Sequence, residues 1–269
     1  MSSPISLRYV ETRLWSALIG ITLATAGYAQ ERRIPLEARK SGIEMSGPDV
    51  RSLQADDFQN PGMLWVERGA KLWNEVAGSK SLACASCHKR AEDSMRGVSA
   101  RYPRFDNKLG RVLNLEGRIN ACRVEHQGTE PFRFETQPML SMAAYLNHQS
   151  RGMPIAVAID GPARPAFEAG ERLYFRRMGQ MNLACTHCHD ANWGRRLLNE
   201  TISQGHGNAY PIYRLEWQTA GSLHRRFRSC LFGVRAEMWP YGVEEYVQLE
   251  LYLAWRAQGL LVETPGVRR

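Results

Sequence analysis

The sequence lacks long apolar runs, which excludes a polytopic membrane protein. A spanning helix needs about 20 consecutive apolar residues, and the only candidate stretch, residues 15–26, is shorter. Arg8 and Arg13 precede this stretch, and the small residues Gly27 and Ala29 follow it. This order is typical of a cleaved export signal, and an uncleaved membrane anchor is the alternative.

The stretch also lacks the arginine pair of a twin-arginine signal. We therefore expect export through the Sec route, cleavage after Ala29, and a periplasmic protein without stable membrane insertion.

Two further absences narrow the class of partner. Basic runs are not interleaved with aromatic residues as nucleic-acid grooves require, so we expect no nucleic acid partner. The glycine-rich segment 205–208 lacks the Lys-Ser/Thr pair of a phosphate loop and is interpreted as a turn. What the chain does have is a formal net charge of +8, which favours anions, acidic proteins or anionic membranes as partners.

Cysteine is scarce, but its placement is informative. Six cysteines in an exported chain would ordinarily suggest three disulfides. Four of them instead form two C-x-x-C-H motifs: Cys84, Cys87 and His88 in the first, and Cys185, Cys188 and His189 in the second. This motif attaches c-type haem, because two thiols on one helical turn reach the vinyl groups of one porphyrin and the adjacent imidazole reaches the iron.

Two other uses of the motif need features that this chain would have to supply. A zinc site would need two more ligands near each motif, and a thioredoxin-like site would need a βαβ frame. We predict two covalently bound haem c groups.

The residues around the two motifs repeat. Superposing Cys84 on Cys185 also aligns the residues before them: Gly69 with Gly170, Leu72 with Leu173, and Trp73 with Tyr174. Apolar residues at these spacings form one face of a helix, and the shared glycine lets another helix pass closely. A second match downstream pairs Tyr145-Leu146 with Tyr252-Leu253, and Gly152 with Gly259. We predict a closing helix in each half, capped by its glycine.

The predicted fold is therefore mainly α, with two tandem cytochrome c-like domains related by an internal repeat. The predicted boundaries are 1–29 for the signal peptide, 30–60 for an N-terminal extension, 61–153 for the first domain, 154–262 for the second, and 263–269 for a C-terminal tail.

His88 and His189 each supply one axial ligand to an iron in this interpretation, and the second ligand determines the chemistry. Met139 and Met142 align with residues of the second closing helix, and we expect them to pack in the core. Met238 remains a candidate for the second axial ligand. The cysteines outside the motifs, Cys122 and Cys230, occupy equivalent places when the halves are superposed, each four residues after an arginine.

This equivalence favours thiolate ligation at both irons, and a disulfide between Cys122 and Cys230 is the alternative. Thiolate donation stabilises ferric iron and lowers the potential, which suggests sulfur chemistry more than simple electron carriage. The basic run 224–228 directly before Cys230 would attract a small divalent oxyanion, since arginine binds such groups with two parallel hydrogen bonds.

At this point the sequence closely resembles the SoxA family, the dihaem cytochrome subunits of the SoxAX complex of bacterial thiosulfate oxidation. The resemblance spans the chain after the export signal. It is most specific in four segments, namely GRVLNLEGRIN at 110–120, QSRGMP at 149–154, YRLEW at 213–217 and RFRSC at 226–230.

The resemblance implies an L-cysteine S-thiosulfotransferase that joins thiosulfate to a cysteine thiol of the SoxYZ carrier and passes electrons to cytochrome c. It implies the small cytochrome SoxX as the partner in a heterodimer. It also implies cysteine ligation opposite each histidine, which fits Cys122 and Cys230. The second haem would be the active one, with Cys230 as the sulfur acceptor, found in the family as a persulfide, and Arg226 as the residue that holds the sulfur substrate.

Two other functions stay open from the residues. A dihaem electron carrier without catalysis would be favoured by methionine ligation. A thiosulfate dehydrogenase would couple two thiosulfates to tetrathionate and would need no carrier protein. Arg118 matches Arg226 in position, so solvent access is expected to decide which of the two haem sites binds substrate.

Overall fold

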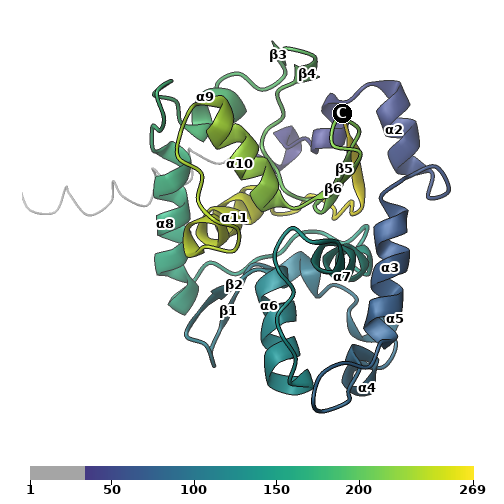
Figure 1. Cartoon of the computed structure of the whole chain (residues 1–269). Helices are drawn as coiled ribbons and strands as arrows, with labels where there is room; N and C mark the ends of the chain where they lie inside the picture. Colours follow the sequence, from purple (N-terminus) through teal and green to yellow (C-terminus); the bar gives the residue numbers. More distant parts are fainter. Residues whose placement is uncertain (1–33) are drawn as a thin grey trace, which may run out of the picture. The chain divides into compact units, whose positions relative to one another are not determined.

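The computed structural model describes residues 34–269, so the predicted export signal lies outside the described residues. Leu36–Arg269 forms one compact unit (Figure 1). No helix within residues 34–269 is both long and apolar enough to cross a bilayer.

Helices dominate this unit, and short strands connect them. The helices are α2 (Pro48–Ala55), α3 (Met63–Asn74), α4 (Cys84–His88), α5 (Ala91–Ser94), α6 (Leu115–Cys122), α7 (Gln137–His148), α8 (Arg164–Phe175), α9 (Cys185–His189), α10 (Leu223–Gly233) and α11 (Glu244–Arg256). The strands are β1 (Arg104–Asp106), β2 (Arg111–Leu113), β3 (Arg196–Leu197), β4 (Glu200–Thr201), β5 (Ile212–Arg214), β6 (Thr219–Gly221) and β7 (Gly266–Arg268). In each half a long helix precedes the cysteine motif, and a hairpin, a shorter helix and a closing helix follow it.

The long helices pack as two pairs, α3 with α7 and α8 with α11 (Figure 1). A glycine lies at each crossing. A Cβ atom at Gly69 would lie 2.2 Å from the Ser141 carbonyl oxygen, and one at Gly170 would lie 2.0 Å from the Gln248 carbonyl oxygen. Both distances are far inside van der Waals contact, so only glycine allows the helices to approach this closely. The predicted close passage of a helix at the shared glycine is confirmed.

The predicted glycine caps are wrong in detail. Helix α7 ends at a cap formed by Gln149, and α11 ends at Ala257. Gly152 and Gly259 lie beyond these caps, in turns. Their φ angles of 78° and 91° are in the left-handed region, which glycine adopts without steric cost.

Two clusters of buried apolar side chains form the core, one around α3 and α7 and the other around α8 and α11. Met139 and Met142 are 1% and 2% exposed in the first cluster, which confirms that they are core residues. The hairpins cross between the clusters. Val112 of β2 packs in the cluster of α8 and α11, and Ala220 of β6 packs in the cluster of α3 and α7. The halves of the chain are therefore interlocked by their hairpins.

Both ends of the described chain pack against the second half. The Lys40 amide donates to Oε1 of Gln204 at 2.8 Å, and Nε2 of Gln204 donates to the Ala38 carbonyl at 2.9 Å. Strand β7, which falls in the predicted C-terminal tail, pairs in parallel with β5 and buries Val267 completely. These segments support the loop and the strand that form one side of the second cysteine site.

Candidate haem sites and active site

The second cysteine motif starts helix α9, and the cysteine outside the motif lies on α10. Ser222 caps α10, because its hydroxyl accepts a hydrogen bond from the Arg225 amide. Cys230 lies close enough to Cys185 and Cys188 that its charge raises the pKa of both. The structure thus brings together the residues that the sequence assigned to one site.

His189 lies against Cys230 in a fixed orientation. Its Nδ1 is 2.8 Å from the Ser203 carbonyl oxygen, and because a carbonyl can only accept, Nδ1 carries the proton. Nε2 is left for the side-chain hydrogen bond with Cys230. Gly205 packs closely against the ring, since a Cβ atom there would lie 3.0 Å from Cγ of His189. Such a second contact orients a histidine for metal ligation.

The surroundings of Cys230 favour its thiolate. Burial raises the pKa of this thiol, but the hydrogen bond to His189 and the charges of Arg226 and Arg214 outweigh burial and lower the pKa to about 7. The side chain is still partly open to solvent. Cys230 is therefore a solvent-accessible cysteine with a lowered pKa.

Arg226 and Arg214 face a cavity of about 400 Å³ beside this site, between α10, β5 and the hairpin of β3 and β4. Arg226 lies one helical turn before Cys230, on the same face of α10. A single acidic residue, Glu200, lines the cavity, and it lies 4.0 Å from the Arg226 guanidinium. The cavity therefore offers positive charge to an anion next to the sulfur of Cys230.

Two arginines of the basic run point elsewhere, contrary to one expectation from the sequence. Arg225 lies 3.8 Å from Glu135 and stacks over the Trp217 ring. Arg228 donates to the carbonyl of Trp239. Of the three guanidiniums expected beside the thiolate, only that of Arg226 is there.

The first cysteine site uses the same elements with opposite electrostatics. Cys84 lies within electrostatic range of Cys122 and Cys87, and Cys122 is hydrogen-bonded to Arg118. Nη1 of Arg118 also donates to Asp106 at 2.7 Å, which neutralises its charge. Burial raises the pKa of Cys122, and Arg118 offsets this only in part. In the protein without bound iron, the pKa of the Cys122 thiol is therefore raised, whereas that of Cys230 is lowered.

A charge reversal in the hairpins separates the two sites. The superposition that pairs Cys122 with Cys230 also pairs Asp106, the last residue of β1, with Arg214, the last residue of β5. At the first site this position holds a carboxylate that pairs with Arg118, whereas at the second it holds Arg214, a cation that pairs with Glu200. Charge, in addition to the solvent access expected from the sequence, distinguishes the two sites.

The donor set fits covalently attached haem. In residues 34–269 no group of three or more His, Cys, Asp or Glu side chains could hold a bare metal ion. A histidine and a cysteine facing each other suit an iron whose four remaining ligands come from a porphyrin. No disulfide joins Cys122 to Cys230 in this structure, and the two cysteines lie among different partners.

Several residues of the second site were missed in the sequence. No sequence pattern could predict the role of the Ser203 carbonyl, since every residue has a backbone carbonyl. His206 of the predicted turn is buried in the wall of the cavity, and its Nδ1 has no hydrogen-bond partner within the described chain. Arg214 could have been found by extending the repeat backwards from Cys230 to the hairpin.

Comparisons with known proteins identify the family of the chain. The family model "SoxA/TsdA, cytochrome c domain" matches residues 68–155. The L-cysteine S-thiosulfotransferase subunit SoxA of Pseudaminobacter salicylatoxidans is 42% identical, over 93% of this chain and 87% of the relative. That of Rhodovulum sulfidophilum is 39% identical, over 85% of this chain and 80% of the relative. In the crystal structure of SoxXA from P. pantotrophus, one chain superposes with a TM-score of 0.83 at 38% identity, covering 86% of this chain and 87% of that one.

The fold and the cysteine motifs define a c-type cytochrome, a protein that binds haem c covalently. Its catalytic class is that of a subunit of an L-cysteine S-thiosulfotransferase. The chain belongs to the SoxA family.

Proposed function

We propose that the protein carries two haem c groups in two tandem cytochrome c-like domains. Cys84 and Cys87 would attach the first, and Cys185 and Cys188 the second. The recurring order of helix, motif, hairpin and closing helix supports this assignment. The iron ligands would be His88 with Cys122 at the first haem, and His189 with Cys230 at the second.

The proposed reaction is the oxidative conjugation of thiosulfate to a cysteine thiol of the SoxYZ carrier. Thiosulfate and a carrier thiol give a carrier thiosulfonate, one proton and two electrons, so that charge balances. The observation that supports it best is the placing of Cys230, with its lowered pKa, between His189 and Arg226 at the edge of a basic cavity.

In this mechanism Arg226 binds the thiosulfate dianion through parallel hydrogen bonds and holds its sulfane sulfur against Cys230. The Cys230 thiolate and the sulfane sulfur form an S–S bond and give up two electrons. Bound haem c supplies the acceptor for these electrons. The carrier thiolate then attacks the outer sulfur of the new bond, which transfers the thiosulfonate and restores the Cys230 thiolate.

The partners and the compartment follow from family membership. A relative is solved as SoxXA, so the small cytochrome SoxX is the proposed partner in a heterodimer, and a cytochrome c is the final electron acceptor. A periplasmic location, after cleavage behind Ala29, is consistent with covalent haem attachment and remains part of the proposal.

The test compares Arg226→Ala with Arg118→Ala, because the two arginines occupy equivalent positions before Cys230 and Cys122. In the haem-loaded complex with SoxX, the change at Arg226 should lower kcat/KM for thiosulfate conjugation about 100-fold, as the loss of one transition-state donor does. The change at Arg118 should leave it within a few-fold.

Product analysis separates the neighbouring functions. Mass spectrometry of the carrier should find the thiosulfonate on its cysteine. Tetrathionate formed without the carrier would instead indicate a thiosulfate dehydrogenase, and equal activity of the two variants would remove Arg226 from the substrate site.

A further inference from the structure

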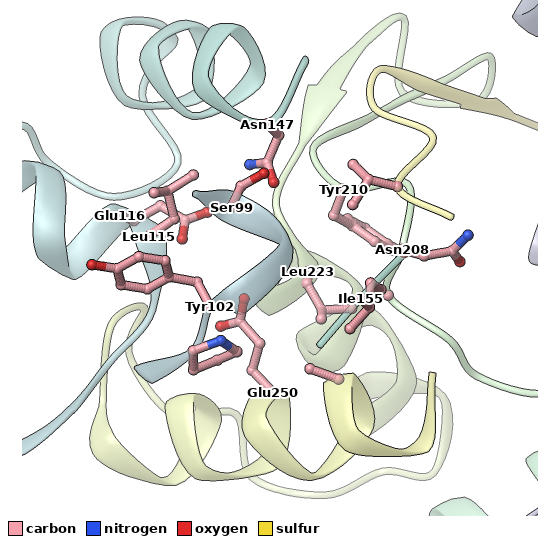
Figure 2. Close-up of a pocket in the computed structure, with 14 residues that line it drawn as sticks. Ser99, Tyr102, Leu115, Glu116, Asn147, Ile155, Asn208, Tyr210, Leu223 and Glu250 are labelled. Atoms are coloured by element: carbon pink, nitrogen blue, oxygen red, sulfur yellow. The ribbon is translucent and has the colours of Figure 1, made fainter. Parts of the chain in front are cut away.

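A second cavity, of about 70 Å³, lies inside the molecule between the two cysteine sites. Figure 2 shows Ser99, Tyr102 and Glu116 on one side of it and Tyr210 and Asn208 on the other, while Glu250 points in from α11. The lining therefore combines both halves of the chain, and it contains both polar and apolar side chains.

Two buried polar atoms in this lining lack a protein partner. Oγ of Ser99 and Oδ1 of Asn208 make no hydrogen bond within the described residues, although their side chains are 6% and 4% exposed. Buried polar atoms are satisfied by ordered water where the protein does not supply a partner. A cavity of this size has room for several water molecules, since each needs about 10–15 Å³ measured in this way.

Two carboxyl groups line the same cavity. Glu250 accepts hydrogen bonds from Nδ2 of Asn114 at 3.0 Å and from Nε2 of His224 at 3.2 Å. The Gly242 amide donates to Nδ1 of His224, so the ring proton is on Nε2 and points to Glu250. These two donors stabilise Glu250 as a carboxylate.

Glu116 is the partner carboxyl and is 9% exposed. Burial raises its pKa, and the negative charge of Glu250 raises it further, to about 7. The other groups that face Glu116 are His224 on α10 and Glu135 before α7; Arg225 pairs with Glu135. Glu116 can therefore gain or lose a proton at neutral pH.

The cavity also lies within electrostatic range of both cysteine sites through its tyrosines. The Tyr102 hydroxyl interacts with Arg118 and Cys122. The Tyr210 hydroxyl interacts with Arg226 and Cys230. A change of charge at either site can therefore alter the potential in the cavity, because interactions in a low-dielectric interior are weakly screened.

We propose that this cavity is a proton-binding site, in which Glu116 exchanges one proton with bulk water through ordered water molecules and its occupancy follows the charge at the two cysteine sites. With haem bound at the cysteine sites, reduction at either site would favour uptake of a proton from solvent by Glu116, and oxidation would favour its release. The protonation of Glu116 stands by itself, and its link to electron transfer rests on the proposed haem ligation.

The first measurement is infrared difference spectroscopy of the oxidised, haem-loaded protein between low and neutral pH. The carbonyl band of a buried carboxylic acid should titrate near pH 7 and should be absent from Glu116→Gln. Glu135→Gln is the matched control, because it removes a buried carboxyl of the same cluster that does not line the cavity. The band should persist in that variant.

Glu250→Gln provides a test that does not depend on the folding of Glu116→Gln. Loss of the neighbouring charge should lower the pKa of Glu116 and shift the band to a more acidic titration. A band that is unchanged in Glu116→Gln, or that does not shift in Glu250→Gln, would overturn the proton-binding site.

The second measurement follows the midpoint potentials of the two haems against pH by spectroelectrochemistry. Since reduction takes up a proton, at least one potential should fall as pH rises through 7, by up to ~59 mV for each tenfold drop in proton activity. Glu116→Gln should remove this fall. Equal slopes in the two proteins, together with a normal infrared band, would refute the coupling and leave the proton site intact.

Discussion

At the scale of single residues, one position in the hairpins contributes to the difference between the two sites, together with the hydrogen bond from His189 that only Cys230 receives. Asp106 bonds Arg118 at 2.7 Å and leaves the pKa of Cys122 raised by burial. Arg214 stands in the equivalent place beside Cys230, is 3% exposed, and helps to lower the pKa of that cysteine. The same scaffold thus raises the pKa of the cysteine at one site, and at the other it lowers the pKa of the cysteine and places a basic cavity beside it.

Arg214→Asp should give the second site the charge arrangement of the first. The new carboxylate would pair with Arg226, so that the arginine could no longer bind thiosulfate freely. We expect KM for thiosulfate to rise ~10–100-fold, corresponding to the loss of about 1.5–3 kcal/mol for a hydrogen bond to a charged group. Steady-state kinetics of the haem-loaded complex would measure it.

The matched control is Asp106→Asn, which frees Arg118 at the first site without touching the second. Its KM should stay within two-fold of the parent protein. An equal rise in both variants would assign the effect to general damage of the hairpins and would refute a special role for Arg214.

At the scale of elements, the helix pairs depend on glycines that no side chain can replace. Gly170→Ala would place a methyl group 2.0 Å from a backbone carbonyl of α11, and a carbonyl within a helix cannot rotate away. The helices would have to separate, at a cost of about 1–3 kcal/mol, the usual range for overpacking. Denaturant unfolding would measure this change in the free energy of unfolding.

Gly233→Ala is the control for that experiment. Gly233 is also helical, but it is exposed at the end of α10, and an added Cβ would meet nothing within 4 Å. Its free energy of unfolding should change by about 0.5 kcal/mol or less. Helix propensity alone favours alanine at both positions, so a Gly170→Ala protein as stable as Gly233→Ala would refute a cost from the crossing of α8 and α11.

The long helices and their crossings could be predicted because their information is local. Gly69 and Gly170 recur at the same distance from their cysteine motifs, and the apolar spacing around them is helical. The short hairpins could not, because a strand of three residues shows no usable alternation. Strand β7 pairs with β5 across more than fifty residues of chain, and no local pattern announces such a pairing.

The residues of the haem sites likewise divide into those that a sequence pattern predicts and those that only the structure shows. Cys122, Cys230 and the two arginines before them were found because reactive side chains at equivalent positions are visible in a repeat. The Ser203 carbonyl was not, since a backbone acceptor has no identity in the sequence. The orientations of Arg225 and Arg228 also required the structure, because only the partners Glu135 and Trp239 turn them from the cavity.

At the scale of the whole molecule, the buried pair of carboxyls joins the halves and makes folding sensitive to pH. The folded protein raises the pKa of Glu116 from 4.5 to about 7, so between these values the native state binds a proton that the unfolded chain has released. The stabilisation is present below about pH 4.5 and is lost as pH rises towards 7, because stability falls with pH wherever the native state holds more protons.

Glu116→Gln should remove this dependence. The free energy of unfolding of the parent protein, compared with the variant, should fall as pH rises from 4.5 to 7, by up to ~1.4 kcal/mol per unit. Above pH 7 the difference should become constant, because both proteins then lack the proton. Denaturant unfolding of the haem-loaded proteins between pH 4.5 and 7 would measure both free energies of unfolding. At each pH the contributions of the other titrating groups cancel in the difference between parent and variant. Parallel curves would mean that Glu116 titrates alike in the folded and unfolded chains, and that the cavity between the halves does not hold its proton.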